Sequence, residues 1–405
     1  MAVTITKALE LIYENVKTKS LKLLPLEMSL GMVLAEDVVA THNLPPFDNS
    51  AMDGFAVRMD DAGKVPEIID TIFAGDNSPA VLSDGLACKI MTGARVPEGC
   101  ESIVPVENTS HDGDKTVLPT QLTEGQHIRL KGEDIREGDL LLTKGQRLSA
   151  HHITLLASQG ISHIRVHKQP RVALFASGHE LKMHFEQVKE YQLYNTNTPT
   201  ILSRCKELGC IVQFIGTAED TLESIHEHIE SALDSDLIIT SGGVSVGDAD
   251  YTKEAFAAFD YDNIFDKIEI KPGKPTVFGQ INSTFVLNLP GNPLAAAMIF
   301  ELFGQSIINA LSGDSEKYLG SIHTKMANNY QSKPGRFTLV PGYFNGENFR
   351  VCDKYAPGMI SPLAGSNSFA LMHSEVTQLN TDDLVKIIPT RFTFHKSTSQ
   401  DLVTR

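Results

Sequence analysis

The apolar positions in the second half of the chain fall into two alternating patterns. Short continuous apolar runs, typical of buried strands, are separated by stretches whose apolar residues recur at helical spacing. The runs are VALF, IVQFIG, LIIT and FVLNL, which begin at Val172, Ile211, Leu237 and Phe285. Helices are expected over 200–208, over 221–233 and from Pro293 onward. This alternation predicts a doubly wound α/β sheet with helices on both faces, over residues 169–315.

Loops rich in small and acidic residues follow these strands. They are SGHEL with Glu180, TAED with Asp220, SGGVSVGDAD, and LPGNP with Pro290 and Pro293. Because doubly wound sheets bind ligands at the carboxyl ends of their strands, the four loops predict one site. A structural alternative stays open for Asp220, since Asp220-x-x-Glu223 before a helix is also a capping-box pattern.

The loop after LIIT is followed by a helical pattern. Ser241, Gly242 and Gly243 let backbone N–H groups approach an anion, and the helix directs its positive end to the same place. The glycine spacing matches neither a P-loop nor a dinucleotide fingerprint. Asp248 and Asp250 would repel a phosphate unless a divalent cation lay between them, so a Mg²⁺-bridged phosphate is expected. Alternatively, Asp250 caps the helix.

The stretch DKIEIKPGKPTVF carries the cations that an anionic ligand needs. Lys267 and Lys271 would share one face if KIEIK is a strand, and Lys274 follows on a Pro-Gly turn. A solvated surface would also carry lysines, and that alternative is strongest for Lys267.

Before the α/β domain the pattern changes twice. Residues 4–16 have the spacing of an amphipathic helix, and 149–160 have that of a second helix. Between them, many Gly, Pro and Asp residues separate short apolar runs, which predicts a small β-rich module. The expected domains are therefore a discontinuous N-terminal helical and linker domain over 1–45 and 136–168, and an inserted module over 46–135.

Three polar turns stand out in the inserted module. FDNSAMDGFAV holds Asp53, MTGARVP holds Thr92, and RLKGED holds Arg129 and Asp134. In the first of them, Asx turns that bond their own backbone are the structural alternative to a binding role. After the α/β domain, short alternating runs between turns predict a small C-terminal β-barrel over 320–395.

Composition narrows the class of protein without naming a function. The 405 residues carry a net charge of −15, which disfavours nucleic acid as the main partner. Five scattered cysteines predict neither a disulfide framework nor a zinc site, and the histidines form no metal-binding spacing. No continuous apolar run long enough to span a membrane and no signal-peptide pattern is present, so a cytoplasmic protein is expected.

The ordered set of motifs resembles the molybdopterin molybdenumtransferase family, which is related to the C-terminal part of gephyrin. The motifs are FDNSAMDGFAV, MTGARVP, KGEDI, TSGGVSVGDADYTK, IKPGKPTVFG, LPGNP and ISPLAGSNSFALM. The resemblance covers nearly the whole chain. It implies insertion of molybdate into adenylylated molybdopterin with Mg²⁺-dependent release of AMP. It also implies a four-domain protomer, a homodimer with a shared active site, and a molybdopterin adenylyltransferase as substrate donor.

Carried over by motif, the resemblance assigns two groups of site residues. The catalytic group is Asp53, Thr92, Glu180, Asp220, Asp250, Lys267 and Lys271. The substrate-binding group is Arg129, Asp134, Pro290 and Pro293, to which loop chemistry adds Ser241, Gly242, Gly243 and Lys274. The metal ligands are expected among Glu180, Asp248 and Asp250.

One position departs from the family pattern. This chain has GHEL where the family has GDEL, which puts a metal role for His179 in doubt. Two other functions were weighed: an enzyme that only adenylylates molybdopterin, and a non-catalytic molybdopterin-binding scaffold. The first consists of the α/β domain alone, and the second calls for a fused domain and a long linker.

Overall fold

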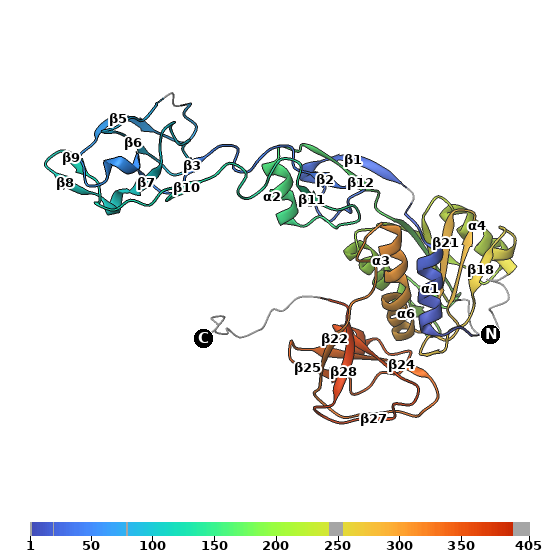
Figure 1. The fold of residues 1–405 in the computed structure, drawn as a ribbon. Coiled ribbons are helices and arrows are strands. Elements are labelled where there is room, and N and C mark those ends of the chain that lie inside the picture. Colours follow the sequence, from blue (N-terminus) through green and yellow to red (C-terminus); the bar gives the residue numbers. More distant parts are fainter. Residues whose placement is uncertain (1, 19, 78–79, 243–253, 392–405) are drawn as a thin grey trace.

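The computed structural model describes residues 2–18, 20–77, 80–242 and 254–391. Figure 1 shows an elongated molecule in which a distal β-rich module, a middle region and an α/β domain follow one another, with a small barrel beside the α/β domain.

A six-stranded sheet forms the α/β domain. Its strand order is β16-β13-β17-β21-β20-β18. The first four strands run parallel, β20 pairs antiparallel with β21, and β18 pairs antiparallel with β20. These strands are β16 (Ile211–Ala218), β13 (Arg171–Ser177), β17 (Leu237–Ser241), β21 (Thr284–Leu289), β20 (Val277–Ile281) and β18 (Asp262–Phe265). The parallel core with crossover helices confirms the predicted α/β fold.

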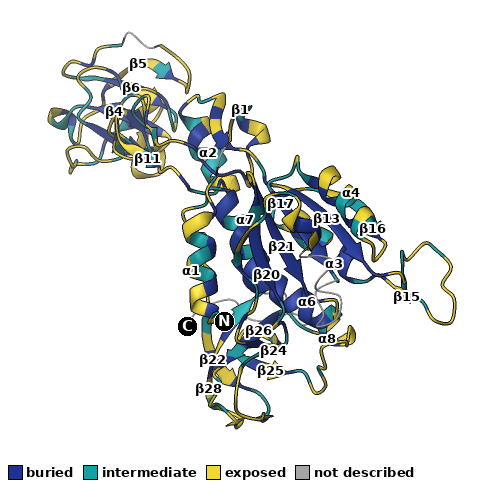
Figure 2. Ribbon diagram, turned by 90° about the vertical axis from the view of Figure 1, so that its right-hand side faces the viewer, coloured by how far each residue is buried: buried dark blue, intermediate teal, exposed yellow. Residues whose placement is uncertain are grey.

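Helices cover both faces of this sheet, as Figure 2 also shows. Along β13, Val172 and Leu174 enter one core while Ala173 and Phe175 enter the other, as strand alternation requires. The first core takes α1 (Ile5–Asn15), α3 (Asn197–Glu207), α6 (Pro293–Ile299) and α7 (Gln305–Leu311). The second takes α4 (Leu222–Ala232) and the helical residues 254–257.

The first helix belongs to the α/β core, although the sequence placed it in the N-terminal domain. Ile5, Ala8 and Ile12 of α1 are buried in the core on one face of the sheet. Just before the helix, the Val3 backbone N–H donates to the Lys267 carbonyl at 2.9 Å. An amphipathic pattern shows that one face is buried but not which core receives it, so the sequence could not place α1.

The middle region is built from two separated segments of the chain. Strand β1 (Leu21–Pro25) pairs with β12 (His163–His167), and β2 (Val38–Val39) pairs with β11 (Leu140–Leu142). The apolar and polar pattern of LLLTKGQRL, which begins at Leu140, suggests a pair of adjoining strands, but β11 pairs with the distant β2 instead. Helix α2 (Ala150–Ser158) packs beside them, and the Ser149 side chain caps it as part of a capping box.

The distal module holds a four-stranded sheet of order β5-β6-β4-β7. Its strands are β5 (Glu67–Ile72), β6 (Leu86–Ile90), β4 (Gly54–Val57) and β7 (Ser102–Pro105). Two short strand pairs complete it: the hairpin of β8 (Ser110–Asp112) and β9 (Lys115–Val117), and the pair of β3 (Asn49–Ser50) and β10 (Ile128–Arg129). The β-rich character predicted for this part of the chain is present.

Five strands close into the predicted C-terminal barrel. They are β24 (Phe337–Phe344), β25 (Asn348–Val351), β22 (Ile322–Met326), β28 (Leu384–Pro389) and β26 (Ser368–Met372), and pairing of β24 with β26 closes the ring. The short strand β19 (Ile270–Lys271) leaves the α/β domain to pair with β24. The barrel is therefore joined to the sheet through the lysine-bearing segment.

A long apolar helix lies inside the α/β domain. Residues Pro293–Leu311 run through α6, a π-helical turn (Phe300–Gly304) and α7, and are long and apolar enough to span a membrane. It is not a continuous apolar run, because Glu301, Gln305, Ser306 and Asn309 lie within it, so the sequence pattern did not single it out. However, 83% of its most apolar stretch is buried in the protein, and Glu301 forms a two-bond ion pair with Arg204 of α3 at 2.6 and 2.9 Å. It is a core helix.

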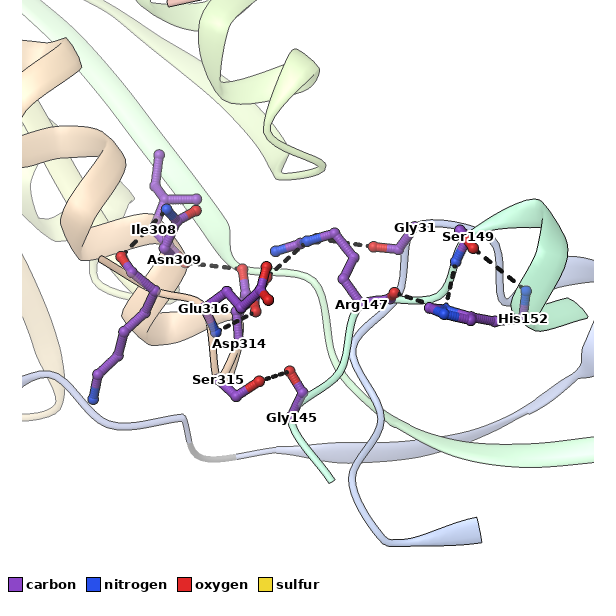
Figure 3. Close-up of polar contacts among 12 residues, drawn as sticks. Gly31, Gly145, Arg147, Ser149, His152, Ile308, Asn309, Asp314, Ser315 and Glu316 are labelled. Carbon is purple, nitrogen blue, oxygen red and sulfur yellow. Dashed lines mark hydrogen bonds and ion pairs between the residues drawn. The ribbon is translucent and has the colours of Figure 1, made fainter. Parts of the chain in front are cut away.

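A polar joint fastens the middle region to the end of α7 (Figure 3). The Arg147 side chain donates through Nε to Asp314 Oδ2 and through Nη1 to the Gly31 carbonyl, each at 2.9 Å. Beside it, the Ser315 N–H donates to the Gly145 carbonyl at 2.8 Å. Asp314 is largely buried, so the guanidinium supplies a charge partner where water has little access.

Candidate functional site

The carboxyl ends of three parallel strands meet at closely packed loops. Ser177, Ser241 and Leu289 end β13, β17 and β21, and the Gly242 N–H lies 3.4 Å from the Leu289 carbonyl that accepts its hydrogen bond. Gly242 has a φ of +97°, and a Cβ there would lie 2.4 Å from the Ser177 carbonyl oxygen. Only glycine allows the backbone to pass this closely, so the chain keeps a narrow backbone-lined cradle at the strand ends.

A buried asparagine ties two of these loops together. Asn197, the first residue of α3, donates through Nδ2 to Ser241 Oγ at 2.7 Å and to the Gly291 carbonyl at 2.8 Å. Thr240 Oγ1 donates to Asn288 Oδ1 at 2.6 Å directly behind them. A buried amide that satisfies two loops holds them at a fixed separation.

Sequence reasoning missed Asn197 and Asn288. A signal existed for both: NTNTPT places two asparagines directly before a helix, and FVLNL places an asparagine inside a buried strand. A polar side chain in such a strand needs a hydrogen-bond partner. The sequence does not say which segment supplies it.

Asp220 lies with Ser177 and His179 at the open side of the cradle. Ser177 Oγ donates to Asp220 Oδ1 at 2.7 Å, and His179 Nδ1 lies 3.3 Å from Asp220 Oδ2. The capping-box alternative for Asp220 does not hold, because Thr221 is the N-cap of α4 and its hydroxyl accepts from the Ser224 N–H. The Asp220 carboxylate therefore faces outward from the site edge, with 41% of its side chain exposed.

Glu180 turns back over the same loop. A Cβ on Gly178 would lie 2.7 Å from the Glu180 carboxylate, so this carboxylate covers the glycine backbone. Gly178, His179 and Asp220 also line an open hollow of about 700 Å³ whose far wall includes Phe214 and Thr217. The hollow gives a ligand access to the strand ends from this side.

The predicted Mg²⁺ site is only partly within the part of the chain that the structure describes. Glu180 and Asp220 supply carboxylate oxygens, the donor type that Mg²⁺ prefers. Across residues 2–18, 20–77, 80–242 and 254–391, no group of three ligating side chains is gathered. Gly243, Asp248 and Asp250 lie outside these ranges. The donors present, Glu180 and Asp220, fit Mg²⁺ in kind.

The three predicted lysines sit at the junction of the sheet and the barrel. Lys267, Lys271 and Lys274 are all exposed. Only Ile270–Lys271 forms a strand, and it pairs with β24 instead of extending the sheet. The turn between the lysines packs on α6, since a Cβ on Gly273 would overlap Ile299. Helix α6 thus packs against the turn between the lysines at one end and begins in LPGNP, beside the cradle, at the other.

The two prolines of LPGNP shape the start of that helix. Pro290 follows Leu289 at the end of β21 and is buried. Pro293 occupies the first turn of α6, where a missing N–H costs nothing. Because proline restricts the backbone, Pro290 and Pro293 fix the path of the chain from the end of β21 to the start of α6.

In the distal module, Asp53 and Thr92 form a pair. Thr92 donates to Asp53 Oδ1 from its backbone N–H at 2.7 Å and from its hydroxyl at 2.8 Å. These hydrogen bonds, the backbone one first, lower the pKa of Asp53. Asp53 therefore accepts from a distant turn, whereas Ser50 bonds the nearby backbone: its Oγ accepts from the Met52 N–H at 3.3 Å, as in an ST turn.

Arg129 and Asp134 lie on the strand and turn beside that pair. Arg129 is exposed on β10, which pairs with β3 in the FDNSAMDGFAV segment. Asp134 is exposed, and its N–H donates to the Leu44 carbonyl at 3.1 Å. The three polar turns predicted in this module are joined by hydrogen bonds: the Lys131 N–H donates to Asp48 Oδ1 at 2.7 Å, and the Gly93 N–H donates to the Ser50 carbonyl at 2.8 Å.

The predicted residues therefore form two groups that do not meet within one chain. Figure 1 shows the module strands β3 and β10 at one end of the molecule and β21 with the sheet at the other, separated by β1, β2, β11 and α2. One group offers a backbone cradle, carboxylates and nearby lysines. The other offers an ionised carboxylate and an arginine. The first group alone has the chemistry to receive a phosphorylated ligand and a divalent cation.

Comparison with known proteins identifies the family of this chain. A family profile described as "MoeA N-terminal region (domain I and II)" matches residues 3–160, and one described as "Probable molybdopterin binding domain" matches residues 173–310. The chain is 33% identical over 372 residues to the molybdopterin molybdenumtransferase of Staphylococcus aureus strain COL, covering 86% of this chain and 88% of that protein.

Two further relatives extend the comparison. The molybdopterin molybdenumtransferase of Staphylococcus epidermidis strain RP62A is 32% identical over 379 residues, covering 88% of this chain and 90% of that protein. The crystal structure of a molybdopterin biosynthesis MoeA protein from Pyrococcus horikoshii superposes with a TM-score of 0.85 at 27% identity, covering 97% of this chain and 100% of that one. Both the sequence and the arrangement of all regions are thus shared.

Proposed function

Because this chain belongs to the molybdopterin molybdenumtransferase family, we propose that it transfers molybdate into adenylylated molybdopterin and releases AMP. It is an enzyme of this type and acts in molybdenum cofactor biosynthesis. The observation that carries the finer proposal is the cradle, in which Asn197 holds Ser241 and Gly291 beside the carboxylate of Asp220.

Different residues of the cradle bind different parts of the substrate. The backbone at Ser241 and Gly242 binds the phosphates of the adenylylated molybdopterin, since glycine allows close approach of N–H groups. Pro290 and Pro293 fix the opposite wall. Glu180, with Asp248 and Asp250, would hold Mg²⁺, which offsets the negative charge of the phosphoanhydride, and the nearby Asp220 carboxylate would support the same site.

The lysines supply the positive pole for the other anion. Molybdate is a doubly charged oxyanion, and the chain has a net charge of −15, so it needs local cations to be held. Lys267, Lys271 and Lys274 are the exposed cations beside α6, and we assign molybdate binding to them. Release of AMP breaks the phosphoanhydride bond. The oxygen of a water molecule bonds to one phosphorus atom, and the other phosphate leaves with the bridging oxygen.

The active site is shared between two protomers of a homodimer. Arg129 belongs to β10, and Asp53, Thr92 and Asp134 lie in the same distal module, which is at the far end of the protomer from the sheet that carries the cradle, so a second chain would bring them to it. A two-fold dimer would form two equivalent sites of this kind. The substrate would come from a molybdopterin adenylyltransferase, because that reaction makes the adenylylated pterin, and the cytoplasm is the compartment we propose.

Mixing two inactive variants tests the shared site. Asp53→Ala and Lys271→Ala chains are unfolded together in equal amounts, refolded, and assayed for molybdate-dependent release of AMP. If pairing is random, about half of the dimers are mixed. In each mixed dimer one site receives both intact residues and the other receives both lesions. About a quarter of all sites should therefore recover activity.

The control is each variant refolded alone, which should stay inactive. Differently tagged chains show that mixed dimers have formed. If mixed dimers are present and activity does not return, both residues come from one chain and the shared-site proposal is wrong.

A further inference from the structure

An exposed aromatic arm stands beside the cradle. We use this name for residues 181–194, which leave the sheet directly after Glu180 and carry β14 (Leu181–Lys182) and β15 (Leu193–Tyr194). Figure 2 shows the arm as an exposed loop that projects from the α/β domain. Phe185 is 76% exposed and Tyr191 is 68% exposed, and Val188, Leu193 and Tyr194 are exposed as well.

The two ends of the arm are hydrogen-bonded to each other beside Glu180. The Leu193 N–H donates to the Glu180 carbonyl at 2.9 Å, and the Asn195 N–H donates to the Lys182 carbonyl at 2.7 Å. Asn195 stands two residues before Asn197, which holds the cradle. A contact made by the arm therefore acts on a segment that is directly joined to Glu180 and ends close to Asn197.

The arm is ordered without burying its aromatic side chains. Glu186 accepts from the Met183 N–H at 2.8 Å, and Gln192 accepts from the Lys189 N–H at 3.1 Å, so two turns are closed internally. The Phe185 ring meets only the edge of the adjacent His184, with ring centroids 5.2 Å apart, among the ring contacts of the part described. Large aromatic side chains that stay exposed on an ordered element are characteristic of protein interfaces.

A matching apolar rim surrounds the other half of the site. We call Met52, Phe73, Val106 and Leu130 the module rim, and each of them is exposed. Met52 and Leu130 adjoin Asp53 and Arg129 in the sequence. The Val106 N–H donates to the Asp53 carbonyl at 3.1 Å, and Phe73 follows Ile72, whose carbonyl accepts from the Met91 N–H next to Thr92 at 3.0 Å.

We infer that the aromatic arm of one subunit docks on the module rim of its partner and closes the shared site. Each half of the site is a polar centre with exposed apolar side chains around it, and each half is incomplete alone. Bringing the two centres together places the arm and the rim in contact, because both adjoin site residues. The inference rests on the proposed shared site. It adds the contact surface that positions the cradle of one subunit against the distal module of its partner.

Photo-crosslinking of the full-length protein tests the contact directly. The photoreactive amino acid p-benzoylphenylalanine replaces Phe185, and after irradiation the crosslinked chains are separated and their peptides are identified by mass spectrometry. The expected product is a crosslink between two chains that joins residue 185 to a peptide containing a module-rim residue. The same amino acid in place of Tyr343, an exposed barrel residue, is the matched control and should give no such product.

A variant pair measures how much the arm contributes. Phe185→Ser/Tyr191→Ser should weaken dimerisation by about tenfold or more in sedimentation experiments, because buried aromatic anchors carry much of an interface's affinity. Tyr343→Ser should leave dimerisation unchanged. Activity lost by the arm variant should return at high protein concentration, which separates docking from a role in the chemistry.

The outcomes distinguish this inference from the proposed function. If the protein is dimeric and the Asp53→Ala and Lys271→Ala chains complement each other, but residue 185 crosslinks only to its own chain or away from the rim, arm docking is wrong and the shared site stands. If the protein is monomeric and complementation fails, the shared site is wrong and arm docking falls with it.

Discussion

At the scale of single residues, Gly242 carries the most restrictive geometry in the site. Its φ of +97° strains any other residue, and a Cβ would overlap the Ser177 carbonyl at 2.4 Å. We expect Gly242→Ala to weaken molybdopterin binding by about tenfold to a hundredfold, since strain of roughly 1–3 kcal/mol must be relieved by moving the loop. Equilibrium binding of molybdopterin measures this.

Gly209→Ala is the control for that substitution. Gly209 has a φ of +82° but has open space around its Cα, so alanine there adds strain without overlap. It should lower stability by about 1–2 kcal/mol and leave binding unchanged. If both alanine variants bind molybdopterin as well as the parent protein, the cradle does not depend on close approach at Gly242.

The Asp53–Thr92 pair makes a prediction about pH. The hydrogen bonds from Thr92 favour the ionised carboxylate and lower the pKa of Asp53. The pair therefore contributes stability above the carboxyl's ordinary pKa, and this contribution is lost as the pH falls through the lowered one. Thr92→Val removes the hydroxyl donor and keeps the backbone donor, so the pKa should rise part of the way. Carbon-13 NMR titration of the Asp53 carboxyl measures it, and an unchanged pKa would show that the hydroxyl bond is not formed.

The site residues show how far sequence reasoning reaches at this scale. Gly242 and Pro293 were predictable, because glycine and proline restrict the backbone in known ways. Asp220 carried two readings in the sequence, and only the position of Thr221 as the helix cap decided between them. Asn197 was not predictable as a partner of Ser241, since that contact joins segments whose spacing only the folded sheet fixes.

At the scale of elements, the strands and helices of the sheet were predictable and their partners less so. Continuous apolar runs mark strands buried on both faces, which is why β13, β17 and β21 stood out. Helix α1 was expected at the right residues but assigned to the wrong core. The same limit applies to Lys267, Lys271 and Lys274, whose segment pairs with the barrel where the sequence suggested a longer strand.

The joint between Arg147 and Asp314 makes a prediction about how elements are held. Arg147→Glu places two acidic groups together in a contact where Asp314 is largely buried. The free energy of unfolding should fall by about 1–3 kcal/mol, since a charged hydrogen bond is lost. Small-angle X-ray scattering should show a changed maximum dimension, because the contact fixes the middle region against α7.

The charge-reversed pair Arg147→Glu/Asp314→Arg should recover most of both effects. Lys7→Glu is the control, because Lys7 forms an exposed ion pair with Glu10 at 3.2 Å, and such pairs contribute little. A joint that matters only for local packing would lower stability without changing the scattering profile, and the positioning role would then be wrong.

At the scale of the whole molecule, the sequence predicted the kinds of domain but not the distance between the two groups of predicted site residues. The alternation of patterns shows where a β-rich module is inserted. It does not show that Asp53 ends far from the cradle, because that depends on how the middle region stands on the α/β domain. The length of the protomer depends on contacts between domains, such as Arg147–Asp314. Such contacts involve few residues and produce no periodic pattern in the sequence.

The position of α1 also sets an order of events during synthesis. Its apolar face is buried only by segments made much later, including α7, and Val3 forms a bridge with Ile268. The four-stranded sheet of the distal module, in contrast, uses strands that lie between Gly54 and Pro105. As the chain leaves the ribosome, the module can therefore fold while α1 is still without a core. The first helix to be made is among the last to be buried, and until then its apolar face is open to chaperones and to other nascent chains.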